Sequence, residues 1–245
     1  MLSNELNLIG LYKKRPELSK NQVFDKITKR SYSLATRGSR SKATNGTASD
    51  YVQLGYKVPN QWQGTFDQTL KIIGDKVGWF TAAFLSRETG RSTLEQLEHD
   101  YHVKGKFIHV IRNPFDNIAT MALRLLSLRL GEHAEKHHIS KQINSSIRRY
   151  FSIARNCQAT KEVFGDRVLD IPGEEFVRDP SKYLRQICDF LEIPCSEDYL
   201  RDCASIVDPV PSVTRSLLVW TPGQIKEVYS LMQPIEFLQG YTFEN

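Results

Sequence analysis

The sequence is short of the features that mark membrane, fibrous and disordered proteins. No apolar run reaches the roughly 18 residues of a membrane-spanning helix, so we expect no membrane span. Only 10 prolines and 14 glycines occur, which excludes a collagen-like chain. The hydrophobic share of 40% and the charged share of 25% are those of a globular protein. No linker divides the chain, which predicts a single domain over residues 1–245.

Cysteine is scarce as well, and its spacing excludes the usual zinc sites. The four cysteines are Cys157, Cys188, Cys195 and Cys203, and no pair has Cys-x-x-Cys spacing. We expect buried thiols, with one late bridge such as Cys195 to Cys203 as the alternative. His133, His137 and His138 have a spacing that can bind metal, but a polar surface is the simpler interpretation, and we expect no metal.

The sequence has no large excess of positive or negative side chains. Thirty-three Lys and Arg against 28 Asp and Glu give a net charge of +5. A mildly basic chain suits an anionic ligand, but a dedicated nucleic-acid binder is more basic, so we expect no nucleic-acid partner. The first residues show no basic region followed by an apolar core, and we expect no signal peptide there.

Three short apolar runs have the character of strands. They are rich in Ile and Val, are bounded by Gly, Asn or Pro, and cover residues 70–74, 107–111 and 168–171. Helical segments separate them. Strands that alternate with helices predict an α/β fold with a parallel sheet and helical crossovers.

The helices are predicted from apolar periodicity and from their end signals. Helices are expected over residues 21–36, 115–130, 143–164 and 180–191. The last one begins well, because Asp179 can cap it and Pro180 suits its first position. The small polar residues 37–50 predict a loop. His109 lies inside a predicted strand, where we expect a hydrogen-bonded core histidine.

The most informative segment follows the strand that ends at Ile111. Asn113 precedes a proline and can cap, and Pro114 opens the next helix. A helix N-terminus at the carboxyl edge of a parallel sheet is where α/β folds bind anions. Arg112 stands at that edge and can fork onto a phosphate, and Thr120 lies two turns into the helix with a second hydrogen-bonding group.

This segment resembles the 3′-phosphate-binding motif of P-loop sulfotransferases, which use 3′-phosphoadenosine 5′-phosphosulfate (PAPS) as donor. Arg112, Asn113, Pro114 and Asp116 match that motif, and Thr120 stands where the family has a serine. The resemblance implies a P-loop NTPase-like sulfotransferase fold. It also implies that Arg112 and Thr120 bind the 3′-phosphate of the nucleotide.

The likeness extends over residues 52–243. Residues 70–76 resemble the strand and Gly-Asp-Lys turn that lie near the sulfuryl group in the family. The resemblance implies catalytic roles for Lys76, in contact with the transferred group, and for Asp75, which holds Lys76 or acts as base. Arg215 matches a C-terminal arginine of the family and is a third candidate for binding nucleotide phosphate.

One part of the family pattern is missing. The 5′-phosphosulfate loop, typically Pro-Arg-Ser-Gly-Thr after a first strand, has no counterpart, because residues 37–42 follow a helix and not an apolar strand. We therefore expect a sulfotransferase fold whose first βα unit is missing, in a fragment or a truncated form. Two functions stay open: sulfuryl transfer from PAPS to a hydroxyl or amine, and a non-catalytic remnant with weak 3′-phosphonucleotide binding. A nucleotide kinase ranks below both, because its Gly-Lys-Ser/Thr loop is absent.

The sequence is compatible with several acceptor substrates and with two cellular compartments. Carbohydrate, protein tyrosine and small alcohols all fit the family as acceptors. Asn45-Gly46-Thr47 and Asn144-Ser145-Ser146 are glycosylation triplets. They fit a Golgi-lumen enzyme whose anchor lies outside this sequence, and a cytoplasmic location is the alternative.

Overall fold

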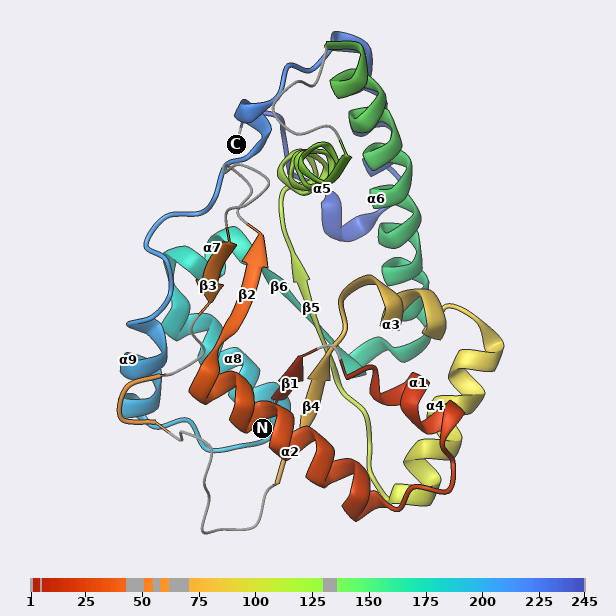
Figure 1. Cartoon of the computed structure of the whole chain (residues 1–245), viewed down its shortest axis with the longest axis vertical. Helices are drawn as coiled ribbons and strands as arrows, with labels where there is room; N and C mark the ends of the chain where they lie inside the picture. Colours follow the sequence, from red (N-terminus) through yellow and green to blue (C-terminus); the bar gives the residue numbers. More distant parts are fainter. Residues whose placement is uncertain are drawn as a thin grey trace.

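The computed structural model places helices around short strands (Figure 1). It describes residues 2–4, 6–42, 51–54, 58–61, 71–129 and 136–244. The helices of this part are α1 (Leu8–Lys14), α2 (Lys20–Arg37), α3 (Gly78–Leu85), α4 (Glu88–Tyr101), α5 (Pro114–Arg129), α6 (Lys136–Phe164), α7 (Gly173–Arg178), α8 (Pro180–Leu191), α9 (Glu197–Ala204) and α10 (Pro222–Met232). Short 3-10 helices follow at η1 (Gly165–Arg167), η2 (Arg215–Leu217) and η3 (Glu236–Leu238).

The described strands form three pairs. β5 (Phe107–Ile111) and β6 (Val168–Pro172) run parallel, with Phe107 opposite Val168 and Ile111 opposite Pro172. β1 (Leu2–Asn4) and β4 (Gly74–Lys76) are also parallel, and β2 (Ser39–Lys42) pairs antiparallel with β3 (Tyr51–Leu54). The crossover from β5 to β6 consists of α5 and α6, which confirms the predicted α/β class.

Two of the expected segments are placed differently. The strand predicted over residues 70–74 is observed at Gly74–Lys76, because β4 pairs only with the three residues of β1; Leu70 lies outside the described residues. Ser39–Lys42, expected in a loop, forms β2, because its partner β3 supplies the backbone hydrogen bonds of a ladder that these polar residues do not favour alone. Residues 43–50 lie outside the described part.

Helix ends follow their local signals. Asp179 accepts a hydrogen bond from the Lys182 backbone N–H at 3.1 Å, so α8 begins as predicted. Ser19 and Gln22 form a capping box at the start of α2. Among the described residues, no helix is long and apolar enough to cross a bilayer.

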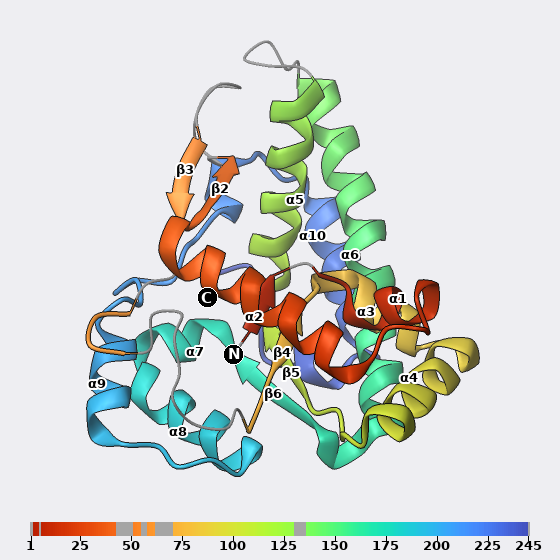
Figure 2. The same cartoon turned by 60° about the horizontal axis from the view of Figure 1, so that its bottom comes forward.

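The main core lies where α5, α6 and α10 pack together with the C-terminal segment (Figure 2). Phe115 is fully buried and packs edge-on against Trp220, Tyr229 and Phe243 at centroid distances of 5.1–5.6 Å. A second cluster joins α1, α2 and α4 through Tyr12, Val23, Ile27, Leu97 and Tyr101. The first core fixes the start of α5, where the predicted site lies.

The cysteines are all free thiols, and only Cys188 is buried. The expectation of buried thiols is therefore wrong for Cys157, Cys195 and Cys203, which are half-buried. Cys157 lies in α6 and Cys203 in α9, and Cys195 lies between α8 and α9.

Candidate functional site

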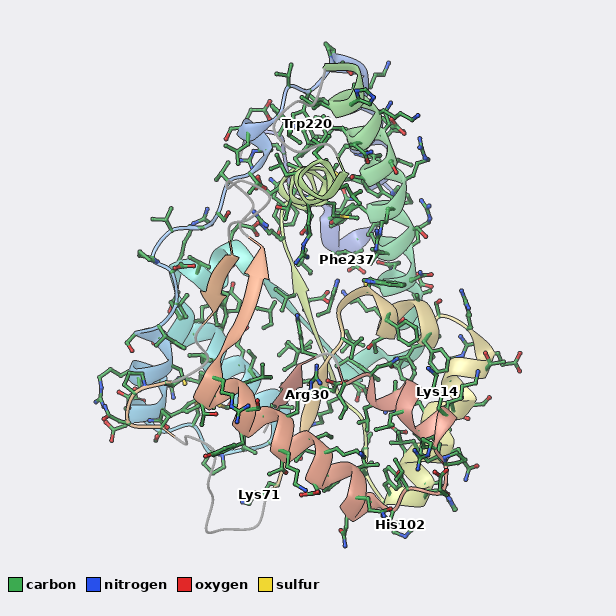
Figure 3. All side chains as sticks on the ribbon, in the orientation of Figure 1. Lys14, Arg30, Lys71, His102, Trp220 and Phe237 are labelled. Carbon is green, nitrogen blue, oxygen red and sulfur yellow. The ribbon has the colours of Figure 1, made fainter. Side chains whose placement is uncertain are left out.

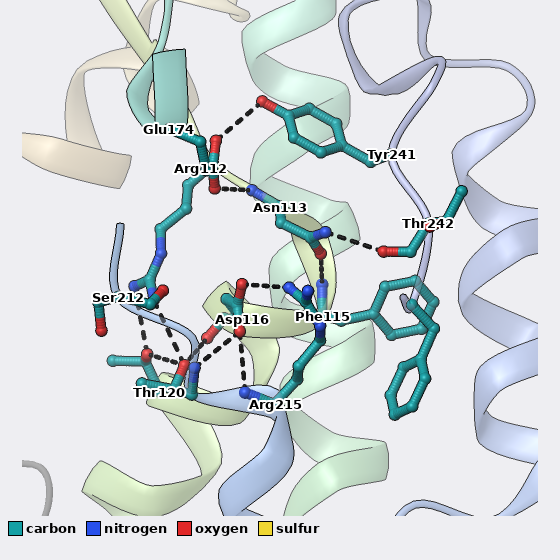
Figure 4. Close-up of polar contacts among 12 residues, drawn as sticks. Arg112, Asn113, Phe115, Asp116, Thr120, Glu174, Ser212, Arg215, Tyr241 and Thr242 are labelled. Carbon is teal, nitrogen blue, oxygen red and sulfur yellow. Dashed lines mark hydrogen bonds and ion pairs between the residues drawn. The ribbon is translucent and has the colours of Figure 1, made fainter. Parts of the chain in front are cut away.

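The junction between β5 and α5 is built around the buried side chain of Asn113. Its Oδ1 accepts a hydrogen bond from the Phe115 N–H at 2.9 Å, which caps the helix as the sequence predicts. Its Nδ2 donates to the Thr242 carbonyl at 2.8 Å, and its own N–H donates to Glu174 Oε1 at 2.7 Å (Figure 4). Asn113 thus joins β5, α7 and the C-terminal segment at one point.

Tyr241 completes this junction from the C-terminal side. Its hydroxyl donates to Glu174 Oε2 at 3.2 Å. Burial raises the pKa of Tyr241 above its usual value, and the neighbouring Glu174 carboxylate adds to the shift. The phenol therefore stays protonated, and Glu174 is held by donors at both of its oxygens.

The structure brings Arg112 and Thr120 together, as the motif predicts. The Arg112 Nη1 atom lies 3.4 Å from Thr120 Oγ1. Its Nη2 atom donates to the Ser212 carbonyl at 2.7 Å and lies 3.4 Å from Thr214 Oγ1. Both groups assigned to phosphate binding therefore sit at the carboxyl end of β5, beside a loop that arrives from 100 residues later.

Thr214 connects the two sides of this cluster. Its hydroxyl donates to the Asp116 carbonyl at 2.8 Å, so its oxygen accepts from its other neighbours. Thr120 Oγ1 lies 2.9 Å away and donates to it. The Thr120 oxygen is thereby left with its lone pairs toward Arg112. Sequence spacing gave no signal for Ser212 and Thr214, since both reach the site from a distant loop.

Asp116 and Arg215 form a buried ion pair under the site. Arg215 Nη1 lies 2.5 Å from Asp116 Oδ2, and the two side chains are 9% and 2% exposed. Asp116 Oδ1 also accepts from the backbone N–H groups of Thr214 and Arg215, at 2.7 and 2.8 Å. The aspartate of the motif therefore fixes the 214–215 loop against α5. The role of Arg215 in binding nucleotide stays a prediction.

The predicted catalytic pair lies on another strand pair. Asp75 and Lys76 belong to β4, whereas Arg112 and Thr120 follow β5. The Asp75 carboxylate accepts from the backbone N–H groups of Leu6 and Leu8, each at 3.0 Å. This holds the segment that leads from β1 into α1, and Lys76 is exposed beside it.

An apolar hollow of about 480 Å³ opens next to Arg112 on the face of β5 and β6. Ile108 and Val110 line it and are 42% and 65% exposed. Its other lining residues are Arg112, Ile171, Gly173, Glu174, Phe176, Val177, Ile187, Asp208, Val210, Pro211 and Ser212. Within the described ranges, no group of three or more His, Cys, Asp or Glu is arranged to hold a metal ion.

His109 lies beneath the site in a polar network between β5, β6 and α6. Its Nδ1 lies 2.9 Å from Asp170 Oδ1, and Lys161 Nζ donates to Asp170 Oδ2 at 2.7 Å. The expected hydrogen-bonded histidine is confirmed. Burial on its own would lower the pKa of His109, but the hydrogen bonds to Asp170 and Cys157 outweigh it and raise the pKa to about 9.

Because these hydrogen bonds favour the protonated form of His109, we expect the free energy of unfolding to fall in mildly alkaline solution. The unfolded histidine has a pKa of about 6.5, so the protonated His109 stabilises the fold fully below that pH and loses its effect as the pH rises to about 9. We expect the free energy of unfolding to fall by about 1–2 kcal/mol between these values, less than the full shift implies because Lys161 also neutralises Asp170.

Urea unfolding at a series of pH values measures this effect. His109→Gln should flatten the pH dependence. His99→Gln is the matched control, because the His99 side chain is 80% exposed and its removal should keep the wild-type slope. Equal slopes for wild type and His109→Gln would contradict the assignment.

Comparisons with known proteins found similarity to sulfotransferases. The family model described as "Sulfotransferase family" matches residues 99–198. No curated protein matches the chain. A sulfotransferase from Alicyclobacillus acidocaldarius is 22% identical, with 66% of this chain and 60% of that chain covered and a TM-score of 0.40. The sulfotransferase domain of the Synechococcus PCC 7002 olefin synthase is also 22% identical, with 66% and 57% covered and a TM-score of 0.41.

A third structure, a sulfotransferase domain from the curacin biosynthetic pathway, is 18% identical, with 66% and 62% covered and a TM-score of 0.42. The chain thus spans less than two thirds of each of these proteins. The residues matched by the family model run from the end of α4 to the start of α9 and include β5, the Arg112–Thr120 segment and β6. By this match, residues 99–198 of the chain are similar to the sulfotransferase family.

Proposed function

We propose that this chain binds a nucleotide with a 3′-phosphate at Arg112 and Thr120 and transfers a sulfuryl group from PAPS. The observation that carries the proposal is the meeting of the Arg112 guanidinium with the Thr120 hydroxyl at 3.4 Å. A guanidinium forks onto phosphate oxygens with charge-assisted hydrogen bonds, and a neighbouring hydroxyl adds a further polar contact. The family match over residues 99–198 supports the same function.

The 3′-phosphate end of PAPS fits the residues present. Arg112 would contribute charge and Thr120 a hydroxyl, while the Asp116–Arg215 pair holds the loop beside them. When bound, PAPS supplies the sulfuryl group. In the transfer, the bond from sulfur to the bridging oxygen breaks, a bond from sulfur to the acceptor oxygen or nitrogen forms, and the acceptor proton passes to a base.

Lys76 and Asp75 keep the roles that the family likeness gives them. Lys76 is exposed on β4 and is proposed as the cation toward the transferred group, where it would stabilise developing negative charge. Asp75 is proposed mainly as a positioning residue, because its two oxygens already accept from Leu6 and Leu8. A hydroxyl or an amine is the proposed acceptor group.

Nucleotide selectivity tests the proposal. Adenosine 3′,5′-bisphosphate should bind this chain at least about tenfold more tightly than ADP, because only the former carries the phosphate that Arg112 and Thr120 recognise. Isothermal titration calorimetry at fixed salt measures both constants. Equal affinities for the two nucleotides would overturn the assignment. Binding without transfer of labelled sulfate would retain the nucleotide site and remove the enzymatic role.

A further inference from the structure

The net positive charge of the chain is concentrated in one segment near its start. Residues 13–42 hold ten Lys and Arg and two Asp and Glu, a net charge of 10 − 2 = +8. The whole chain has +5, so the remaining residues carry 5 − 8 = −3. A modest overall charge therefore conceals a strongly basic region that runs from the last two residues of α1 through α2 and β2.

The exposed cations of α2 lie on one side of that helix. At 3.6 residues per turn they fall within an arc of about 100°. We call this set the basic stripe, and it consists of Lys26, Lys29, Arg30 and Arg37. Asp25 is the one acidic residue of the helix and pairs with Lys29 at 2.6 Å in an exposed ion pair. Figure 3 shows α2 across the lower front of the molecule, with Arg30 labelled on it.

A hollow of about 440 Å³ lies along the same helix. It is lined by Thr28, Lys29, Tyr32, Ser33 and Arg37. Tyr32 is 47% exposed, so its ring offers an apolar face to a ligand. Cations, hydroxyls and one exposed aromatic ring together suit a sugar ring that carries an acidic group, because the ring face stacks while the polar groups hold its oxygens.

We propose that the basic stripe and its hollow bind an acidic oligosaccharide, a sugar chain with carboxylate or sulfate groups. The inference goes beyond the proposed function and rests on the charge of α2 and on the hollow beside it. Lys26 and Arg37 are about 16 Å apart along the helix axis, a span that matches repeated anions on a polymer better than one small anion.

The helix is poorly suited to the other anionic partners. Binding to a membrane surface needs an apolar face, and the apolar residues Val23 and Ile27 are fully buried against the core. Single-stranded nucleic acid is bound by several stacking aromatic rings, whereas Tyr32 is the exposed ring of this hollow. An acidic sugar chain needs one stacking ring and a row of cations, which α2 supplies.

Direct binding of a defined sugar chain tests the proposal. A heparin-derived hexasaccharide should bind the 245-residue chain. Its affinity should fall as salt is added, because salt screens the charges, and the neutral sugar maltohexaose should not bind. The triple variant Lys26→Gln, Lys29→Gln, Arg37→Gln should bind the acidic chain at least about tenfold more weakly. Tyr32→Ala should weaken binding further, and Tyr32→Phe should retain it.

The matched control removes the same charge elsewhere. Lys104→Gln, Lys141→Gln, Lys226→Gln changes three exposed lysines outside α2 and should bind like wild type. Circular dichroism and thermal unfolding of each variant show whether its overall helix content and stability are those of wild type. Equal losses in the two triple variants, equal binding of maltohexaose, or tighter binding of single-stranded RNA or phosphatidylserine vesicles would overturn the proposal.

The hexasaccharide titration contains no nucleotide, so its outcome is independent of the 3′-phosphate test. If the basic stripe is needed for hexasaccharide binding but the protein shows no 3′-phosphate selectivity, the proposal for the stripe stands and the proposed function is wrong. If 3′-phosphate selectivity is found and the hexasaccharide does not bind, the proposed function stands and the proposal for the basic stripe is wrong.

Discussion

Asp116→Ala is expected to lower the free energy of unfolding by about 3–5 kcal/mol, because it leaves the buried Arg215 guanidinium without its counter-charge. The backbone N–H groups of Thr214 and Arg215 lose their acceptor as well. For a chain of this size the melting temperature should fall by roughly 6–20 °C. Differential scanning calorimetry and urea unfolding measure the two quantities.

Two further variants separate the ion pair from general damage. Asp25→Ala breaks the Lys29 pair, whose side chains are 75% and 55% exposed, and should change stability by less than about 1 kcal/mol. The double variant Asp116→Ala, Arg215→Met removes both charges and should recover part of the loss. If Asp116→Ala were as stable as Asp25→Ala, the ion pair would not be what holds the 214–215 loop.

Loss of the Asp116–Arg215 ion pair should also weaken nucleotide binding at Arg112 and Thr120. Asp116 fixes Thr214, and Thr214 in turn contacts Thr120 and Arg112. Asp116→Asn keeps an oxygen acceptor and is the milder change, so it is the variant in which nucleotide binding can be measured on folded protein. A weaker affinity for adenosine 3′,5′-bisphosphate is expected there, with ADP unchanged.

Local features of the fold were predictable from the sequence where the signal was itself local. The strand 107–111 and the helix 180–191 were placed at their observed bounds, because each combines an apolar pattern with a strong end signal. The 70–74 strand was misplaced because strand length depends on the partner, and a three-residue partner far along the chain leaves no mark on its pattern.

The residues of the candidate site were likewise predictable only where their signal in the sequence was local. Arg112 and Thr120 lie eight residues apart on one strand–helix junction, so motif spacing alone puts them together. Ser212, Thr214 and Thr242 reach the site through loops about 100 residues or more away, and their contacts are made largely with backbone groups. Backbone partners carry no side-chain signature in a sequence, and only the folded chain shows them.

Arg112→Ala is expected to weaken binding of adenosine 3′,5′-bisphosphate by about 10–150-fold, equivalent to about 1.5–3 kcal/mol for a charge-assisted hydrogen bond. Affinity for ADP should stay unchanged, because ADP lacks the phosphate that Arg112 recognises. Arg112→Lys keeps the charge and loses the planar fork, so its affinity should fall between wild type and alanine.

The design of this measurement follows from the contacts of Arg112. Its Nη2 atom donates to the Ser212 carbonyl at 2.7 Å, so the variant also releases a surface loop, and the titration needs a stability check by thermal unfolding. Arg155→Ala removes an exposed arginine of α6 and is the matched control for charge. Calorimetry at constant ionic strength avoids a change in screening between samples. Superimposable titrations of wild type and Arg112→Ala would show that the 3′-phosphate is bound elsewhere, whereas a loss confined to the 3′-phosphorylated nucleotide would assign its recognition to this guanidinium.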